Sequence, residues 1–222
     1  MAAATLAVFA LSVLVGSVPW AYVIAKAVTG EDITAHGSGN VGAMNVRRTT
    51  GSWSWFAVAV FADGSKGLVP TLLAKTILAG LPVTAPSSEA GAAALVIQAA
   101  VAGAVVGHNY SIWLALARRR LARTGKGLAA GGGALLAYDV RYFVAVLVVG
   151  LLVLAATRVM LVGQAAAALS LPATAALLRS SDVGFAAAVA GIVLLAHARR
   201  LAGLARGEEP RLYVDDGAGP RG

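Results

Sequence analysis

A glycine-rich segment between residues 36 and 48 contains the residue types that hold phosphate groups in proteins. Glycine lets successive backbone N–H groups turn toward one anion and lets the chain approach it closely. Arg48 adds a guanidinium that can make two charge-assisted hydrogen bonds to a phosphate. A solvated loop between two helices is the alternative interpretation. We predict an anion-binding nest formed by Gly37, Ser38, Gly39, Asn40, Gly42, Asn45 and Arg48.

A second candidate is the turn Gly125-Lys126-Gly127, which follows Thr124 and opens an apolar run. Glycine on both sides of Lys126 exposes the backbone around a point charge. The start of a helix adds unpaired N–H groups and the positive end of the helix dipole. The alternative is a flexible basic turn at the lipid headgroups that continues the preceding arginines.

Two nucleotide-binding motifs are excluded by context. The glycine spacing of the first segment matches Gly-x-Gly-x-x-Gly, but no strand is predicted before it, and the following acid, Asp63, lies inside a long apolar run. The lysine turn is not a Walker A loop, because Gly127 stands where Ser or Thr is required.

The C-terminal region contains a third candidate, in which His197 and Arg200 lie at the end of the last apolar run and Arg206 to Pro210 follow. Taken alone, this pattern is typical of a basic helix end at the membrane surface.

Ionisable residues also occur inside apolar runs, where they are costly. Asp63 and Lys66 are three residues apart, so they share a helical face and can neutralise each other. We interpret them as a structural pair. His108 either orients the site or is a satisfied buried histidine, and Gly103 with Gly107 indicates close helix packing.

The elements that position these residues are membrane helices. Hydrophobic residues make up 59% of the 222 residues and charged residues 13%, too few for a water-soluble domain of this size. The net charge of +8 fits the enrichment of Lys and Arg in cytoplasmic loops, so nucleic acid is not expected as a partner. Cysteine is absent, which excludes disulfides and thiolate chemistry, and we expect no metal and no cofactor.

We predict an all-α, polytopic membrane protein with about seven transmembrane helices; six is the alternative. Seven spans place most Lys and Arg residues on one side of the membrane, with Arg141 and Arg179 on the other, which predicts an outside N-terminus and a cytoplasmic C-terminus. The first run is interpreted as a retained helix and not as a signal peptide. Residues 1–212 form one predicted domain, and 213–222 a disordered tail. The predicted spans are 4–28, 53–80, 89–117, 126–138, 141–156, 159–178 and 182–199.

In their order along the chain, these motifs resemble the PlsY family of acyl-phosphate:glycerol-3-phosphate acyltransferases. The resemblance rests on Gly16-Ser17-x-Pro19, the segment from Gly37 to Arg48, Asp63-x-x-Lys66-Gly67, Gly107-His108, Gly125-Lys126-Gly127, His197 and Gly207-x-Glu209. It implies seven spans, a cytoplasm-facing site in a bacterial membrane, and acyl transfer from acyl phosphate to glycerol 3-phosphate. By position it implies that Ser38, Arg48, Lys126 and His197 are catalytic, that Gly125 and Gly127 bind substrate, and that Asp63, Lys66, His108 and Glu209 support the site. Arg200 stands where the family has Asn, and we expect it to bind substrate as a replacement for a lost cation.

The chain departs from the family pattern at several positions. The family has Thr at position 44, a second Gly at 124, Thr at 130, Ser at 161, Asn at 200 and Arg at 203. This chain has Met44, Thr124, Ala130, Leu161, Arg200 and Gly203 there. Two rival functions follow: a catalytically weakened relative that binds phosphate or anionic lipid, and a small transporter. The lack of internal repeats counts against the transporter.

No residue resembles a nucleophile with a base beside it. His197 is the general-base candidate that the family match offers, although it could instead orient a substrate. Acyl phosphate is already activated, so we expect a monomer that positions its two substrates for direct attack by the glycerol hydroxyl, with a donor phosphate oxygen as the proton acceptor.

Overall fold

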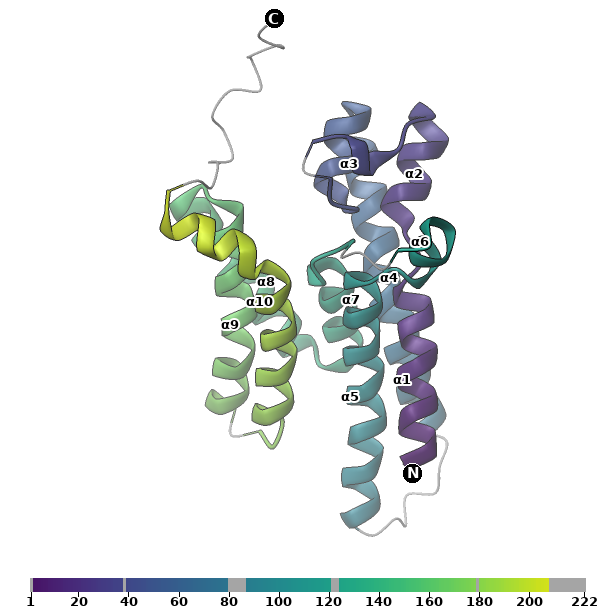
Figure 1. The fold of residues 1–222 in the computed structure, drawn as a ribbon. Helices are drawn as coiled ribbons and strands as arrows, with labels where there is room; N and C mark the ends of the chain where they lie inside the picture. Colours follow the sequence, from purple (N-terminus) through teal and green to yellow (C-terminus); the bar gives the residue numbers. More distant parts are fainter. Residues whose placement is uncertain (1, 38, 80–86, 121–123, 179, 208–222) are drawn as a thin grey trace, which may run out of the picture. The chain divides into compact units, whose positions relative to one another are not determined.

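The computed structural model describes residues 2–37, 39–79, 87–120, 124–178 and 180–207, and these residues form helices and connecting turns without a β-strand (Figure 1). Ser38, Glu209 and the predicted disordered tail lie outside the described residues. The helices are α1 (Ala2–Gly16), α2 (Trp20–Thr29), η1 (Ile33–Ala35), α3 (Ala43–Thr50), α4 (Trp53–Ala79), α5 (Ser87–Asn109), α6 (Ile112–Arg118), α7 (Leu128–Tyr138), α8 (Val140–Thr157), α9 (Met160–Leu177) and α10 (Val183–Ala205). The chain divides into two compact units, residues 1–143 and 144–222.

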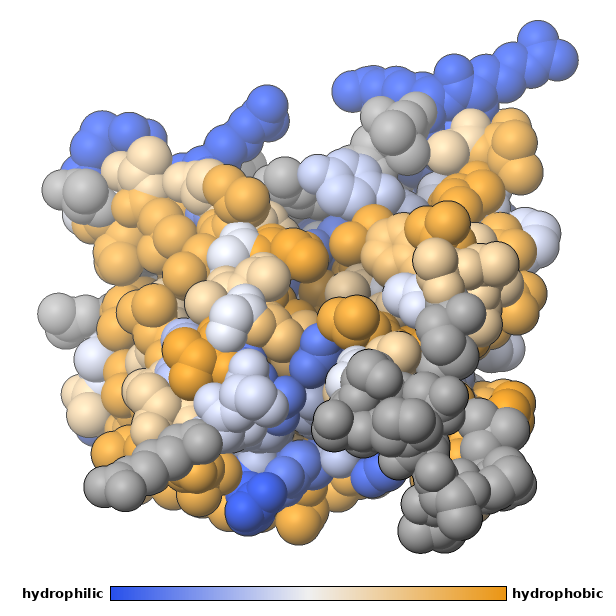
Figure 2. Space-filling model, turned by 90° about the horizontal axis from the view of Figure 1, so that it is seen from below, coloured by the Kyte–Doolittle hydropathy of each residue, from blue (hydrophilic) through white to orange (hydrophobic). Residues whose placement is uncertain are grey.

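Six segments of the described chain are long and apolar enough to cross a membrane. They are Ala2–Thr29, Trp53–Ala79, Gly91–Arg118, Val140–Thr157, Met160–Leu177 and Val183–Leu204. Large apolar side chains such as Phe61 (79% exposed) and Leu177 (85% exposed) point outward from them. Apolar residues also cover most of the face shown in Figure 2. Surfaces of this kind are stable in hydrocarbon and not in water.

The fourth predicted span is the helix α7, which has 11 residues. At 1.5 Å per residue it is about 16 Å long, roughly half of the hydrocarbon thickness. The main-chain oxygens of Ala137 and Tyr138 at its C-terminal end accept hydrogen bonds from Lys75 Nζ in α4, at 2.8 and 3.0 Å. The lysine thereby satisfies carbonyl groups that have no partner within the helix. α8 begins at Val140, one residue before the start of the predicted span 141–156.

The predicted spans 4–28 and 89–117 are confirmed as apolar segments of spanning length, Ala2–Thr29 and Gly91–Arg118, but each contains a break in its helix. The first span ends at Gly16 and restarts at Trp20, because Pro19 lacks a backbone N–H and restricts the residue before it. The third span breaks after Asn109, and Ser111 caps the short helix α6 by accepting from the Leu114 N–H. Ser111 Oγ also donates to the Ser17 main-chain oxygen at 2.6 Å. The two breaks therefore lie side by side.

Glycine allows two pairs of helices in the first unit to pack closely. A Cβ atom at Gly103 or Gly107 in α5 would collide with main-chain oxygens of α1, which confirms the predicted small-residue packing. In the same way, a Cβ at Gly67 of α4 would collide with Ala130 of α7, and one at Gly133 of α7 with Gly64 of α4. These contacts fix α1 against α5 and α4 against α7 (Figure 1).

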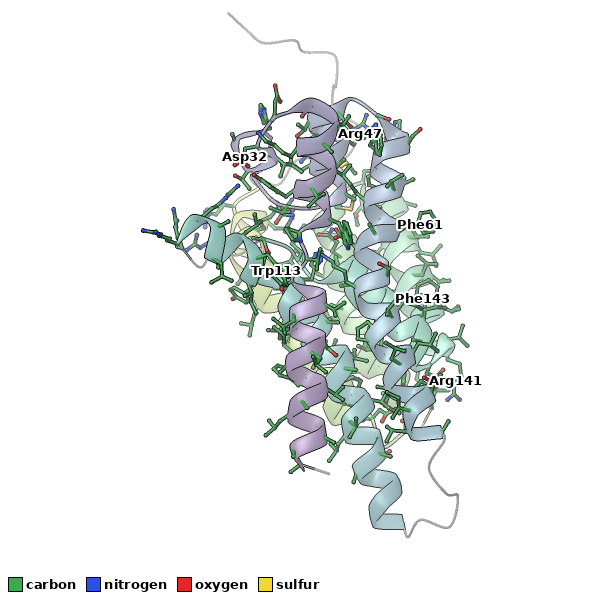
Figure 3. All side chains as sticks on the ribbon, turned by 90° about the vertical axis from the view of Figure 1, so that its right-hand side faces the viewer. Asp32, Arg47, Phe61, Trp113, Arg141 and Phe143 are labelled. Carbon is green, nitrogen blue, oxygen red and sulfur yellow. The ribbon has the colours of Figure 1, made fainter. Side chains whose placement is uncertain are left out.

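A small apolar cluster supports the end of the first unit that contains α2 and α3 (Figure 1). It joins α2, η1, α3, α4 and α6, and Val41 and Val46 attach the glycine-rich segment to it. Figure 3 shows Asp32 and Arg47 at this end of the unit and Arg141 near the other. The buried residues of the cluster are Ala21, Ile24, Ala25, Ile33, Val41, Val46, Ala59 and Leu114.

Candidate active site

The side chain of Asn45 organises the glycine-rich loop from inside. Asn45 is 2% exposed, and its Nδ2 donates to the main-chain oxygens of Ile33 at 2.9 Å, His36 at 3.0 Å and Asn40 at 3.1 Å. These three carbonyl groups span the loop from η1 to the start of α3. The amide that the sequence suggested for substrate binding therefore holds the loop in shape.

Two of the predicted glycines have backbone angles that favour glycine. Gly37 has φ +53° and Gly39 has φ +66°, both in the left-handed region. A Cβ atom on Gly37 would also meet Asn45 Oδ1, and it would lie 3.2 Å from Arg48 Cδ. The Arg48 side chain therefore runs against the Gly37 backbone. Gly42 precedes the first residue of α3, close to the Asn40 amide.

The neighbouring arginines Arg47 and Arg48 have different environments. The Arg47 guanidinium lies 4.1 Å from the ring centroid of Trp53, a cation–π contact. Arg48 is exposed and makes no hydrogen bond or ion pair with any other residue that the structure describes. Its guanidinium is thus available to an anionic ligand at the loop.

An ion pair that the sequence analysis missed fixes the outer side of the loop. Arg118 of α6 contacts Asp32 Oδ2 at 2.6 Å and donates to Thr34 Oγ1 at 2.9 Å. Burial raises the pKa of the Asp32 carboxyl, but hydrogen bonds from Thr34 and Arg118 outweigh it, so its pKa lies below the ordinary value. His36 Nε2 pairs with Glu31 Oε2 at 3.0 Å on the same side.

The glycine-rich loop and the lysine turn meet directly. The backbone N–H of Val41 donates to the main-chain oxygen of Thr124 at 2.8 Å. Thr124 N–H donates in turn to the Asn109 oxygen at 2.9 Å, and Thr124 Oγ1 accepts from Ser111 N–H at 3.1 Å. Thr124, a departure from the family pattern, therefore links the loop, the turn and the end of α5.

The predicted supporting residues lie directly beneath the lysine turn. Lys66 Nζ is 2.7 Å from Asp63 Oδ1, which confirms the predicted pair, and it also donates to the Val18 main-chain oxygen at 2.9 Å. His108 Nδ1 lies 3.9 Å from the same Asp63 oxygen. A Cβ atom at Gly125 would collide with the His108 ring. The buried charges thus support the break after α1 and the lysine turn together.

The start of α7 completes this region. Gly127 has φ +80° and precedes the first residue of the helix, beside the buried side chain of Asn109. Lys126, between the two glycines, is partly exposed. Its turn is joined to the segment that contains Arg48 by the Val41–Thr124 hydrogen bond.

The C-terminal candidates belong to the second unit. His197 in α10 is 2% exposed, with Nδ1 2.8 Å from the Val193 oxygen and Nε2 3.0 Å from Gln164 Oε1. Arg200 lies one turn further along α10 and is partly exposed. Leu161, where the family has Ser, is fully buried in α9.

Comparisons with known proteins define the class first. The fold resembles that of a crystal structure described as PlsY, an integral membrane glycerol 3-phosphate acyltransferase, in the glycerol 3-phosphate form. The TM-score is 0.77 at 24% identity, covering 93% of this chain and 94% of that chain. The lysophosphatidic acid form gives a TM-score of 0.76 at 23% identity, with the same coverage.

The sequence comparisons identify the family. The family model for glycerol-3-phosphate acyltransferase matches residues 6–207. A glycerol-3-phosphate acyltransferase from Thermosynechococcus vestitus is 36% identical over 211 residues, 93% of this chain and 94% of the relative. A glycerol-3-phosphate acyltransferase from Anaeromyxobacter sp. is 34% identical over 218 residues, which cover 94% of this chain and 97% of the relative. The chain belongs to the glycerol-3-phosphate acyltransferase (PlsY) family and is a multi-pass membrane enzyme.

Proposed function

We propose that this protein transfers a fatty acyl group from acyl phosphate to glycerol 3-phosphate, giving lysophosphatidic acid and phosphate. The observation that carries the proposal is the Val41–Thr124 backbone hydrogen bond, because it joins two separate phosphate-binding motifs into one surface. The related proteins carry the name glycerol-3-phosphate acyltransferase. A reaction between two phosphorylated substrates needs a surface that holds two phosphate groups, whereas one of the motifs would be enough to bind a single anion.

Positive charge and backbone N–H groups do most of the binding. Arg48 and Lys126 neutralise phosphoryl oxygens, and the loop glycines and Gly125 and Gly127 let the backbone approach them. Asn40 and Ser38 supply neutral hydrogen bonds, and Arg200 in the second unit keeps the substrate-binding role that the sequence predicts for it. Asn45 acts by holding the loop, and Asp63, Lys66 and His108 by holding the lysine turn. Glu209 has the supporting role that the family pattern implies.

The chemical step is direct attack. The glycerol hydroxyl oxygen bonds to the acyl carbon, the bond from that carbon to the phosphate oxygen breaks, and the departing phosphate takes the hydroxyl proton. The positioned charges stabilise the leaving group. Both ring nitrogens of His197 contact neighbouring groups in the second unit. This favours an orienting role for His197 over that of a general base and so supports direct attack.

The proposed topology has seven crossings, with α7 as the short one, the N-terminus outside and the C-terminus in the cytoplasm. Basic residues at the loop end of the first unit support this orientation, since Arg47, Arg48 and Arg118 lie there. The active site then faces the cytoplasm of a bacterial cell. We also propose that the chain works as a monomer and as one functional domain.

The test is phosphate release by the purified full-length protein in detergent or nanodiscs, with palmitoyl phosphate and glycerol 3-phosphate. Release that depends on glycerol 3-phosphate, with lysophosphatidic acid formed in equal amount, supports the proposal. Arg48→Ala should reduce kcat/KM about a hundredfold or more, since it removes a charge-assisted contact. Arg141→Ala, with 64% of its side chain exposed near the other end of the unit, is the matched control (Figure 3). Binding of glycerol 3-phosphate without turnover would instead identify a catalytically weakened relative.

A further inference from the structure

Gln164 is a polar residue that neither the family motifs nor the proposed mechanism uses. It lies near the start of α9, and His197 lies in α10. The two helices pack together within the second unit, and Gln164 Oε1 lies 3.0 Å from His197 Nε2. His197 is 2% exposed, so the Gln164 amide contacts a ring nitrogen that lies within the packed helix pair.

The other ring nitrogen determines where the proton lies. His197 Nδ1 is 2.8 Å from the main-chain oxygen of Val193, and a carbonyl oxygen can only accept a hydrogen bond. Nδ1 therefore carries a hydrogen, which leaves Nε2 of a neutral ring as an acceptor. Such an acceptor requires a donor. A glutamine provides one when its NH₂ group faces the ring, because the amide nitrogen and oxygen exchange places by a half-turn.

We propose that Gln164 is the positioning residue of His197: its amide donates to Nε2 and holds the imidazole in the Nδ1–H form. Arg200 is three residues after His197, so both lie on neighbouring positions of one helical face. The Gln164–His197 hydrogen bond therefore fixes the rotation of this face of α10 relative to α9. Its effect on catalysis rests on the proposed acyl transfer.

Glutamine suits this role better than other residues of similar size. Leucine fills a comparable volume but offers no hydrogen bond, so it removes the contact of the amide with the ring nitrogen. Asparagine has the amide but is shorter by one methylene. Gln164→Leu therefore removes the hydrogen bond to His197 while it keeps most of the side-chain volume between α9 and α10.

The kinetic test compares the full-length protein with Gln164→Leu and with Leu169→Met, a matched control on the same helix whose side chain is 56% exposed. Gln164→Leu should lower kcat about tenfold at saturating substrates, with KM for glycerol 3-phosphate changed less than threefold. The control should stay within twofold. In a His197→Ala background, Gln164→Leu should cause no further loss. Unchanged kcat, or the same loss without His197, would overturn the inference.

A second measurement does not depend on activity. The chain has three histidines, so ¹⁵N-histidine labelling gives few resonances, and the His197→Ala variant assigns the relevant pair. We expect a protonated Nδ1 in the parent and a shifted Nε2 resonance in Gln164→Leu. An unprotonated Nδ1, or an Nε2 resonance that does not respond to the substitution, refutes the positioning role. A parent protein without turnover would count against the acyl-transfer proposal alone, and this spectrum would still decide the role of Gln164.

Discussion

Replacing Asn45 by Ala tests whether the glycine-rich loop depends on a single buried amide. The substitution removes the donor for three main-chain oxygens, all between 2.9 and 3.1 Å from Nδ2. The amide has two hydrogens to share among them, and each hydrogen bond contributes about 1 kcal/mol, with more lost where a buried acceptor keeps no partner. We estimate that Asn45→Ala destabilises the ordered conformation of the loop by about 2–3 kcal/mol. This corresponds to roughly a 30- to 150-fold fall in kcat/KM for glycerol 3-phosphate, since binding must restore that order.

The assay is steady-state phosphate release in detergent, with the thermal unfolding midpoint measured on the same samples. We expect a smaller effect on the midpoint than on kcat/KM, because the three acceptors of the Asn45 amide all lie between residues 33 and 40. The control is Thr50→Val, which removes a hydrogen bond within α3, from Thr50 Oγ1 to the Val46 oxygen at 2.8 Å, and no contact of the loop. A kcat/KM within threefold of the parent for Asn45→Ala would refute the reasoning.

Three further predictions concern charges that hold the first unit together. Lys66→Met should destabilise the fold by about 3–5 kcal/mol, because it leaves the Asp63 carboxylate buried without its partner, and adding Asp63→Leu should recover part of the loss in thermal unfolding. Lys75→Met should cost about 1–3 kcal/mol by leaving the carbonyls at the end of α7 without a donor, and amide hydrogen exchange in α7 should quicken. The Asp32 ion pair should stabilise the protein above the ordinary carboxyl pKa of 3.8 and lose this effect as the pH falls through the lowered folded value. The unfolding midpoint of Asp32→Asn should therefore lie below that of the parent at pH 6, and the difference should shrink toward pH 3. A constant difference would contradict the pairing.

The sequence predicted the membrane helices and the motifs well because both depend on residue type and spacing. Long apolar runs, the Asp63–Lys66 pair and the junction near Asp139 required no tertiary information. The helix breaks at Pro19 and Ser111 were missed, since hydropathy continues through both positions. The helix α3 was missed as well, because its polar composition resembles that of a loop.

The roles of individual polar residues were harder to predict than their presence. An asparagine in a glycine-rich loop has the same sequence signal whether its amide binds a ligand or, as with Asn45, the loop's own backbone. Thr124 was identified as a departure, but its links to Ser111 and Asn109 depend on contacts between distant segments. Gln164 gave no signal, since a single glutamine in an apolar helix has no distinctive spacing.

The short helix α7 has a consequence for how the protein is made. A segment of 11 residues is too short to partition into the bilayer and span it unaided. The glycine contacts with α4 and the hydrogen bonds from Lys75 supply what its own length does not. α4 precedes α7 in the chain, so the helix that α7 packs against is synthesised first. The first unit therefore assembles in chain order at this point: α7 depends on the earlier helix α4 both for close packing and for the donor at its C-terminal end.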